Sequence, residues 1–396
     1  MGKGVSLKRL NVTYSLIQMM YFAAFAAFCG FQTALLLERG FTSSQAGVLA
    51  AVRFLAGIIA QPAIGGWLDR NPGIRLKRVL TLMLGLGAAV NLVYYFTRLS
   101  FGGTALLTLA LGVLELNLYP LLDSLGLQFI NAGVEINYSL SRGMGSLAYA
   151  VACAALGTLS AAWGTEVTLL FHILLLLAVI LTVNLFPDPP ERERMAEKKE
   201  MPHSVGEILR GNPAFTLMLA AVFCAIAAVM PVAGFLIHIV EARGGNESHL
   251  GFALFLMGAS ELPAALIFSR LRQRLGSGGM MLLSVVFMAV KPLAFLAAPT
   301  LGMLMVAQLI QMPGYGFFTP AAVYYANESV SAADRVRGQT IMMTASNGLG
   351  GMAGNLLAGY VVDWGGVSAL LWVCFGFGLL GAVLALASVR TAKKQI

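Results

Sequence analysis

Apolar runs long enough to cross a lipid bilayer follow one another along most of the chain, and this feature constrains the fold most. A transmembrane helix needs about 20 predominantly apolar residues, because the hydrocarbon core of a bilayer is about 30 Å thick. Backbone groups in lipid must be satisfied within the spanning segment, so such runs predict helices. We place twelve of them, at residues 11–36, 43–67, 78–98, 103–127, 139–162, 166–186, 212–240, 247–269, 278–298, 300–326, 336–361 and 366–389.

The composition excludes a soluble globular chain. Of 396 residues, 58% are hydrophobic and only 11% are charged. Soluble domains carry about a quarter of their residues as Asp, Glu, Lys and Arg, because polar groups must face water. The 44 glycines, many of them inside apolar runs, are typical of helices that pack closely within a membrane. The sequence therefore predicts an all-α membrane protein with the lipid bilayer as its solvent.

The basic residues predict the orientation of the chain. With a cytoplasmic N-terminus, all but five of the 26 Lys and Arg residues fall on the cytoplasmic side, as the positive-inside rule requires. We therefore expect a multi-pass protein of the cell (plasma or inner) membrane with both termini cytoplasmic. Topology also explains the net charge of +8 better than nucleic-acid binding, which we do not expect. The first run is too long for a cleaved signal peptide and is expected to be retained. The five exceptions are Arg39, Arg53, Arg98, Arg243 and Lys291.

A charged, proline-bounded stretch interrupts the apolar pattern halfway along the chain. It divides the sequence into an N-terminal six-helix bundle at 1–186, a cytoplasmic linker at 187–211 and a C-terminal six-helix bundle at 212–396. Weak echoes relate the halves, since Arg142-Gly143 opens the fifth run and Arg337-Gly338 opens the eleventh. Such echoes are expected of two pseudo-symmetric repeats.

Enzymatic chemistry has no support in the sequence. It contains no phosphate-binding loop, no HExxH, no GxSxG and no CxxC, so we expect no enzyme activity, no cofactor and no metal site. The four cysteines are scattered through apolar segments and are expected to be small buried hydrophobes.

Three ionisable residues, Arg53, Glu115 and Glu261, lie near the middle of predicted spans, and Lys291 lies in the outer part of the ninth span. Each costs at least about 2.5–3.5 kcal/mol at mid-membrane and so calls for a reason. Arg53 and Glu115 are expected either to compensate each other as a structural pair or to take part in proton coupling. Glu261 is the first candidate for the proton carrier, with Glu115 and Asp123 as alternatives. Glu115, Tyr119 and Asp123 follow at four-residue spacing and predict one stripe of a single helix.

The loop after the second span resembles a signature of the major facilitator superfamily. It reads GGWLDRNPGIRLKR from Gly65 to Arg78 and is similar to the G-x-x-x-D-R-x-G-R-K motif, with its second glycine one residue late. The resemblance implies a conformational latch formed by Gly65, Asp69 and Arg70, in which the glycine permits a tight turn. It also implies the major facilitator fold, with twelve transmembrane helices in two bundles. The alternative is an ordinary positive-inside loop.

Three longer stretches resemble the lactose-permease-like branch, which includes oligosaccharide, nucleoside and aromatic-acid proton symporters. They begin at Glu38, Ala253 and Arg335. In the permease that gives the branch its name, helix four carries a carboxylate, helix five an arginine, and an indole seven residues later stacks on the sugar. The matching positions here are Asp123, Arg142 and Tyr149, which the resemblance implies to bind substrate. Asp for Glu shortens the reach, and Tyr for Trp shrinks the aromatic platform.

Helices one and ten line the cavity in this superfamily, so Gln18, Tyr21 and Gln311 are further candidates for substrate binding. Hydrogen bonding between helices is the equal alternative for the glutamines. Gln311 and Gly314 stand where the symporter has a histidine and its proton-carrying glutamate, so any proton coupling must use other groups. His172 and His238 are expected to be hydrogen-bonding residues near the membrane interface.

Together these features predict a secondary active transporter, expected as a monomer, that moves a small polar solute by alternating access with proton symport. The solute would be a sugar, nucleoside or small organic acid, held between Asp123, Arg142 and Tyr149 on one side and Gln311 on the other. The first alternative is a proton-driven efflux antiporter of the same superfamily, although the arginine motif of span four and the G-P-x-x-G-G element of span five are missing. The second is a non-transporting membrane sensor or scaffold.

Overall fold

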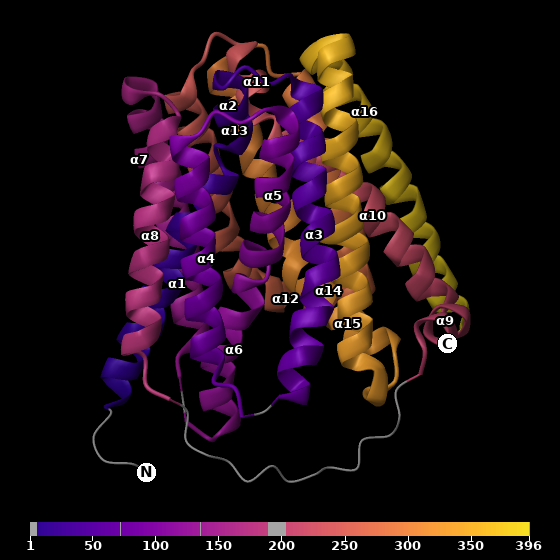
Figure 1. Cartoon of the computed structure of the whole chain (residues 1–396). Helices are drawn as coiled ribbons and strands as arrows, with labels where there is room; N and C mark the ends of the chain where they lie inside the picture. Colours follow the sequence, from indigo (N-terminus) through magenta and orange to yellow (C-terminus); the bar gives the residue numbers. More distant parts are fainter. Residues whose placement is uncertain (1–5, 72, 135, 189–202, 396) are drawn as a thin grey trace. The chain divides into compact units, whose positions relative to one another are not determined.

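Every regular element in the described residues is a helix (Figure 1). The computed structural model describes residues 6–71, 73–134, 136–188 and 203–395. The chain divides into two compact units. Unit 1 comprises residues 1–41, 52–196 and 247–255, and unit 2 comprises residues 42–51, 197–246 and 256–396.

Unit 1 contains the N-terminal helices. Its core is built from apolar side chains of several helices, among them Tyr14, Leu80, Leu118 and Val179. α1 packs along α7 and α8, and α4 packs along α8. The helices are α1 (Leu7–Cys29), α2 (Gln32–Glu38), most of α3 (Ser43–Arg70), α4 (Leu76–Phe96), α5 (Phe101–Glu115), α6 (Leu118–Asn131), α7 (Tyr138–Trp163), α8 (Glu166–Leu185) and the start of α12.

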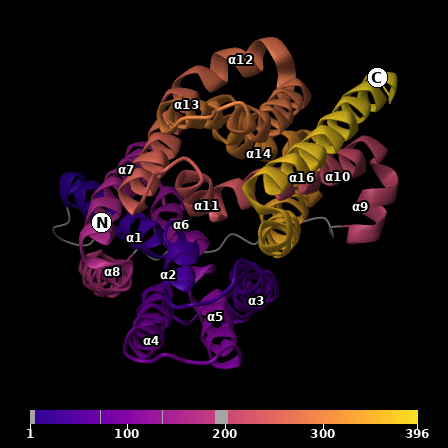
Figure 2. The same cartoon turned by 90° about the horizontal axis from the view of Figure 1, so that it is seen from above.

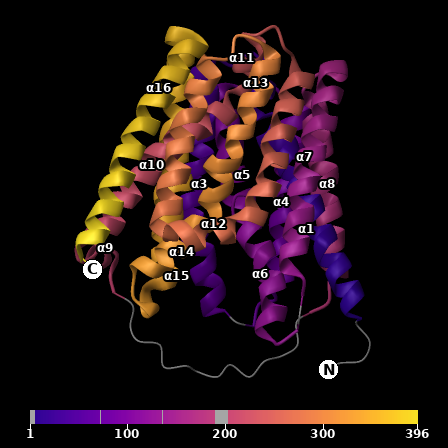
Figure 3. The ribbon, with the colours of Figure 1, turned by 180° about the vertical axis from the view of Figure 1, so that it is seen from behind.

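Unit 2 contains the C-terminal helices around a second core that includes Phe215, Met280, Val285 and Phe318. α10 lies along α16 (Figure 2). The elements are the start of α3, α9 (Val205–Gly211), α10 (Pro213–Gly234), α11 (Leu236–Glu241), most of α12 (Glu247–Leu296), α13 (Leu301–Gln308), the 3-10 turn η1 (Leu309–Gln311), the π-helical η2 (Met312–Gly316), α14 (Phe317–Ser329), η3 (Ala332–Asp334), α15 (Arg335–Met343), the π-helical η4 (Thr344–Gly350) and α16 (Gly351–Gln395). Figure 3 shows these helices from behind.

In the described residues, ten helical segments are long and apolar enough to cross a membrane. Two of them, Glu247–Leu296 and Ala332–Ala392, contain a glycine with positive φ, Gly276 at 70° and Gly366 at 67°. Only glycine adopts this backbone without strain, so both segments break there. Division at the two glycines yields twelve segments, which correspond to the twelve predicted runs. The division into linear halves at 1–186 and 212–396 stays a prediction.

The outward faces of the spans are apolar. Leu106, Leu266, Val306 and Trp364 are 70%, 80%, 68% and 87% exposed. Soluble proteins rarely present large apolar surface to water, whereas lipid tails are its natural neighbours. The structure therefore agrees with the membrane prediction drawn from composition.

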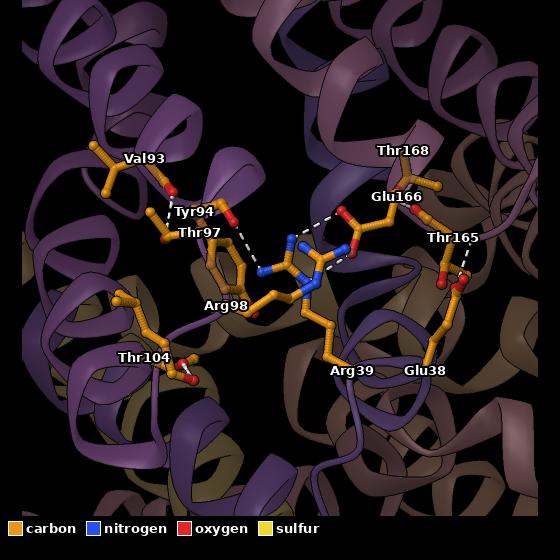
Figure 4. Close-up of polar contacts among 11 residues, drawn as sticks. Glu38, Arg39, Val93, Tyr94, Thr97, Arg98, Thr104, Thr165, Glu166 and Thr168 are labelled. Atoms are coloured by element: carbon orange, nitrogen blue, oxygen red, sulfur yellow. Dashed lines mark hydrogen bonds and ion pairs between the residues drawn. The ribbon is translucent and has the colours of Figure 1, made fainter.

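A bidentate ion pair ties α2 and α8 in unit 1 (Figure 4). Arg39 Nε and one of its terminal nitrogens donate to the two carboxylate oxygens of Glu166, each at 2.8 Å. Arg39 also donates to the Tyr94 carbonyl oxygen at 2.9 Å and lies over the Tyr94 ring. Arg98 approaches the same carboxylate at 2.9 Å. Arg39 and Arg98, two of the five basic residues outside the predicted cytoplasmic loops, therefore both compensate the charge of Glu166.

A short helix, α9, lies within the predicted linker. The linker was predicted as residues 187–211, of which 189–202 lie outside the described residues. α9 forms at its end because Ser204 and Glu207 make a reciprocal capping box, a signal visible in the sequence. Hydrogen bonds from Ser204 hold the pKa of Glu207 below its ordinary value.

Candidate functional site

A polar cluster in unit 1 joins α1, α6 and α7. Gln18 Nε2 donates to Asp123 Oδ1 and to the Tyr14 hydroxyl, both at 3.0 Å. Arg142 Nε donates to the Tyr119 hydroxyl at 3.2 Å. The structure therefore brings Gln18 into one region with Asp123 and Arg142, although Gln18 lies more than 100 residues before both in the sequence.

Two polar atoms of this cluster lack a hydrogen-bond partner within the described part of the chain. They are Arg142 Nη1 and Gln18 Oε1, and both are shielded from solvent. Among the described ion pairs none joins Arg142 to Asp123. Buried polar atoms are normally hydrogen-bonded, so an orphaned donor and an orphaned acceptor in one cluster mark a place where a ligand can complete the network.

Aromatic rings surround the same cluster. The Arg142 guanidinium lies 4.2 Å from the centre of the Phe22 ring. Tyr21 and Tyr119 stack with centroids 6.5 Å apart, and Phe25 contacts Tyr149 with centroids 6.2 Å apart. Tyr149 and Tyr21, which were predicted as substrate contacts, therefore belong to this aromatic group. Phe22 and Phe25 were not predicted, because Phe side chains in an apolar span carry no signal that separates a site from lipid-facing packing.

Glycine allows α1 and α7 to meet at this site. A Cβ atom on Gly145 would lie 2.7 Å from Phe22 Cδ2 and 3.3 Å from the Gln18 carbonyl oxygen. A larger residue would overlap the Phe22 ring and crowd the Gln18 carbonyl oxygen, so the surroundings of Gln18 would have to shift.

A second polar cluster of unit 1 contains Arg53 and Glu115, which were expected to compensate each other. They do so: an Arg53 terminal nitrogen lies 3.5 Å from Glu115 Oε2. Asn91 Nδ2 donates to Glu115 Oε1 at 2.7 Å, and His172 Nε2 lies 3.0 Å from the same oxygen. Arg53 also donates to the Cys29 sulfur at 2.9 Å. Whether Arg53 and Glu115 couple protons stays a prediction.

His172, expected as a hydrogen-bonding residue near the membrane interface, is 3% exposed and bonds within the Glu115 cluster. Its depth in the membrane stays a prediction. One expectation about this region was wrong. Glu115 does not share a continuous helix with Tyr119 and Asp123, because α5 ends at Glu115 and α6 begins at Leu118. Pro120 explains the break, since its ring clashes with the carbonyl group four residues earlier. The predicted stripe is therefore split between two clusters.

A third polar chain lies in unit 2 and includes Gln311 and Glu261. Lys291 Nζ donates to Gln311 Oε1 at 2.7 Å, and Gln311 Nε2 donates to Glu261 Oε1 at 3.0 Å. Lys291 is only 2% exposed. Gln311 ends the 3-10 turn η1 immediately before the π-helical η2, and such irregular turns are frequent at functional sites. The amide thus bridges a buried cation and a carboxylate. Neither the predicted substrate contact of Gln311 nor the proton role of Glu261 is tested by this geometry.

One part of the latch prediction, the tight turn at Gly65, is wrong. Gly65 does not form a tight turn: it lies inside α3, which continues to Arg70, and the turn follows at Asn71. A Cβ atom on Gly65 would meet nothing within 4 Å, so the helix accommodates this position without constraint. Arg70 donates to the Gly66 carbonyl oxygen of its own helix. The side chain of Asp69 lies outside the described atoms, and the latch stays a prediction.

Asp363 caps the first turn of α3 within unit 2. Its carboxylate accepts hydrogen bonds from the backbone N–H groups of Ser43 and Ser44 at 3.2 and 2.7 Å. His238 Nε2 lies 3.1 Å from the Ser43 hydroxyl. A helix N-terminus favours an anion, so this contact stabilises the start of α3. His238, expected as a hydrogen-bonding residue, takes that role.

Comparisons with known proteins agree in fold and in class. A sequence model of the MFS_1 like family matches residues 11–373. The maltose permease of Geobacillus stearothermophilus is 28% identical over 393 residues, which cover 97% of each chain. The uncharacterized transporter YwbF of Bacillus subtilis (strain 168) is 21% identical over 360 residues, 90% of this chain and 88% of that one. The crystal structure of the nucleoside transporter NupG superposes with a TM-score of 0.77 at 18% identity, covering 97% of this chain and 99% of that one; this last likeness concerns the fold alone.

Proposed function

This chain belongs to the MFS_1 like family of the major facilitator superfamily of membrane transporters, and we propose that it takes up a small saccharide by alternating access together with protons. The multi-pass fold and the transporter class follow from the family. The substrate, the direction and the coupling ion are the proposal. They rest on the polar and aromatic cluster of α1, α6 and α7 in unit 1.

The observation that carries the proposal is the pair of orphaned atoms, Arg142 Nη1 and Gln18 Oε1, beside aromatic rings. A saccharide hydroxyl accepts a hydrogen bond from a guanidinium and donates one to an amide oxygen. The C–H faces of a sugar ring are apolar and pack against flat aromatic side chains such as Tyr21 and Tyr119. One ligand class thus satisfies both features of the site.

The relatives support the same substrate class. The maltose permease is similar to this chain over nearly its whole length, and its name states a disaccharide substrate. Asp123, held by Gln18, is a carboxylate and can accept a hydrogen bond from a sugar hydroxyl. In this proposal Asp123, Arg142 and Gln18 recognise hydroxyl groups, and Tyr149 and Phe25 contact the sugar's apolar face.

Uptake by purified protein in proteoliposomes tests the proposal. With an inside-alkaline pH gradient, radiolabelled maltose should accumulate, whereas an efflux antiporter would extrude it under the same gradient. Arg142→Ala should lower the initial rate by about 10- to 100-fold, because a charge-assisted hydrogen bond contributes about 1.5–3 kcal/mol. Replacing maltose by uridine separates a saccharide carrier from a nucleoside carrier.

The matched control is Arg210→Ala, which removes the same side chain from the exposed surface of α9. It should leave uptake unchanged within about twofold, as surface substitutions are usually near neutral. Normal uptake by Arg142→Ala, with correct insertion of both variants, would remove the proposed site.

A further inference from the structure

His172 is held between two oxygen atoms. Its Nδ1 lies 2.8 Å from the Ala24 carbonyl oxygen of α1, and its Nε2 lies 3.0 Å from Glu115 Oε1 of α5. A carbonyl oxygen has no proton to donate, so Nδ1 must carry one. A neutral imidazole then has a bare lone pair on Nε2, which would face a carboxylate oxygen at 3.0 Å.

That arrangement requires one additional proton. Either Nε2 is protonated and donates to the carboxylate, or the Glu115 carboxyl is protonated and donates to Nε2. Rotation of the ring by 180° does not remove the requirement, because it would point carbon atoms at both oxygens and lose both hydrogen bonds. The proton therefore belongs to the Glu115–His172 pair, whichever atom carries it.

The charged groups around the Glu115–His172 pair favour reversible binding of the shared proton. Arg53 of α3 lies 3.5 Å from the other Glu115 oxygen, and Asn91 of α4 donates to Oε1. From α1, Cys29 accepts a hydrogen bond from Arg53, and the Phe28 ring lies 4.6 Å from the Arg53 guanidinium. With the shared proton the cluster carries one net positive charge, and without it the cluster is neutral. A buried net charge is costly, whereas the neutral state costs only the repulsion between Nε2 and Oε1.

The two hydrogen bonds that join Lys291, Gln311 and Glu261 in unit 2 require no additional proton. Lys291 donates to the Gln311 oxygen, and the Gln311 amide donates to Glu261. An ammonium, an amide and an ionised carboxylate satisfy these two bonds in their ordinary states. These two bonds therefore demand no extra proton, although Glu261 was the first candidate from the sequence.

We propose that the Glu115–His172 pair is the proton-binding site of this transporter, an assignment that rests on the proposed proton-coupled uptake. Loss of the proton would place a lone pair against a carboxylate, so the ring and the carboxylate must separate. Because His172 of α8 bonds to α1 and Glu115 of α5 bonds to α3 and α4, this separation uncouples α8 and α1 from α5, α3 and α4. Proton binding and release are thereby converted into movement within unit 1.

A small void borders both this pair and two aromatic rings of the saccharide site. It measures about 10 Å³ and is lined by Tyr21, Phe25, Arg53, Glu115 and His172, among others. That volume is close to the minimum that holds one water molecule. Tyr21 and Phe25 belong to the aromatic group of the saccharide site, so a sugar bound there would cover the approach to the proton.

Spectroscopy tests the shared proton without any substrate. Nitrogen-15 NMR of histidine-labelled protein, with His172→Gln to assign the signal, reports whether Nε2 carries a proton. Infrared spectroscopy, with Glu115→Gln as the reference, reports whether the carboxyl is protonated. At neutral pH one of the two should be protonated. A neutral His172 ring with an unprotonated Nε2 beside an ionised Glu115 overturns the proposal.

Transport then tests coupling. In proteoliposomes, His172→Gln and Glu115→Gln should reduce pH-driven maltose accumulation by about tenfold or more, since intramembrane ionisable groups mark proton paths. Exchange of labelled for unlabelled maltose at equal pH should persist, because it needs no proton release. His249→Gln, which replaces an exposed histidine, is the matched control and should accumulate maltose normally.

Normal pH-driven accumulation by His172→Gln overturns the assignment of the pair. If the unsubstituted protein moves no saccharide, that result contradicts the proposed function instead. The spectroscopic result then still shows whether the Glu115–His172 pair shares a proton.

Discussion

Lys291 and Glu261 both occupy α12, on either side of the break at Gly276, and they meet through the side chain of Gln311. The sequence identified both charges as requiring a reason but assigned no partner to Lys291. A buried ammonium is stable only when paired, so Gln311 and Glu261 supply the compensation. The burial of the Lys291 ammonium therefore gives Gln311 and Glu261 their role as its partners.

A double-mutant cycle tests this compensation. Glu261→Gln should destabilise the protein by about 3 kcal/mol, because it leaves a buried cation without its carboxylate. Combining it with Lys291→Met should recover most of that loss, since replacing both charges by uncharged groups is often neutral. Denaturant unfolding in detergent measures the free energies, and simple additivity of the two changes would contradict the pairing.

Glycines set how closely elements approach within unit 1. A Cβ atom on Gly157 of α7 would lie 2.6 Å from Gly251 Cα and 2.7 Å from the Glu247 carbonyl oxygen, at the start of α12. Gly143 lies in the same helix, α7, and a Cβ atom there would meet nothing within 4 Å. The sequence showed many glycines in apolar runs, but it could not show which of them face another backbone.

The two glycines of α7 therefore predict opposite effects of one substitution. Gly157→Ala should destabilise the protein by about 1–3 kcal/mol, because the added methyl overpacks a backbone contact. Gly143→Ala should be neutral or stabilising by about 0.4–1 kcal/mol, because alanine reduces the entropy of the unfolded chain. Thermal unfolding of both variants in the same detergent checks the difference, and equal effects would argue against the close contact.

At the scale of the whole molecule, the distribution of Lys and Arg predicts an orientation that helix geometry alone does not decide. A helix spans a membrane equally well in either direction, and the asymmetry of the anionic cytoplasmic leaflet selects one of them. Most basic residues fall in the predicted cytoplasmic loops. Of the exceptions, Arg39, Arg53 and Lys291 are held by protein partners.

Reporter fusions test the orientation. Green fluorescent protein fused after residue 396 should fluoresce, because it folds on the cytoplasmic side. Alkaline phosphatase inserted in the α4–α5 turn at residues 97–100 should be active, because it folds only after export. The reverse pattern would show that the positive-inside count misplaced the chain.

The orientation rests on the sign of the loop charges and stays a prediction. Membrane class and spans could be predicted because they depend on local quantities, run length and hydropathy. Even there, Pro120 broke a predicted stripe and the Ser204–Glu207 capping box extended helix into the predicted linker. Asp123, Arg142 and Tyr149 were identified because their spacing resembles a known pattern.

Only the tertiary structure decided which of these groups meet. His172 looked like an isolated interfacial histidine, yet helix packing places it 3.0 Å from Glu115, 57 residues away. Phe22 and Phe25 carried no sequence signal, yet they surround Arg142 and Tyr149. Hydropathy and charge are properties of single residues, whereas a shared proton or an orphaned hydrogen bond is a property of two atoms, and folding alone brings those atoms together.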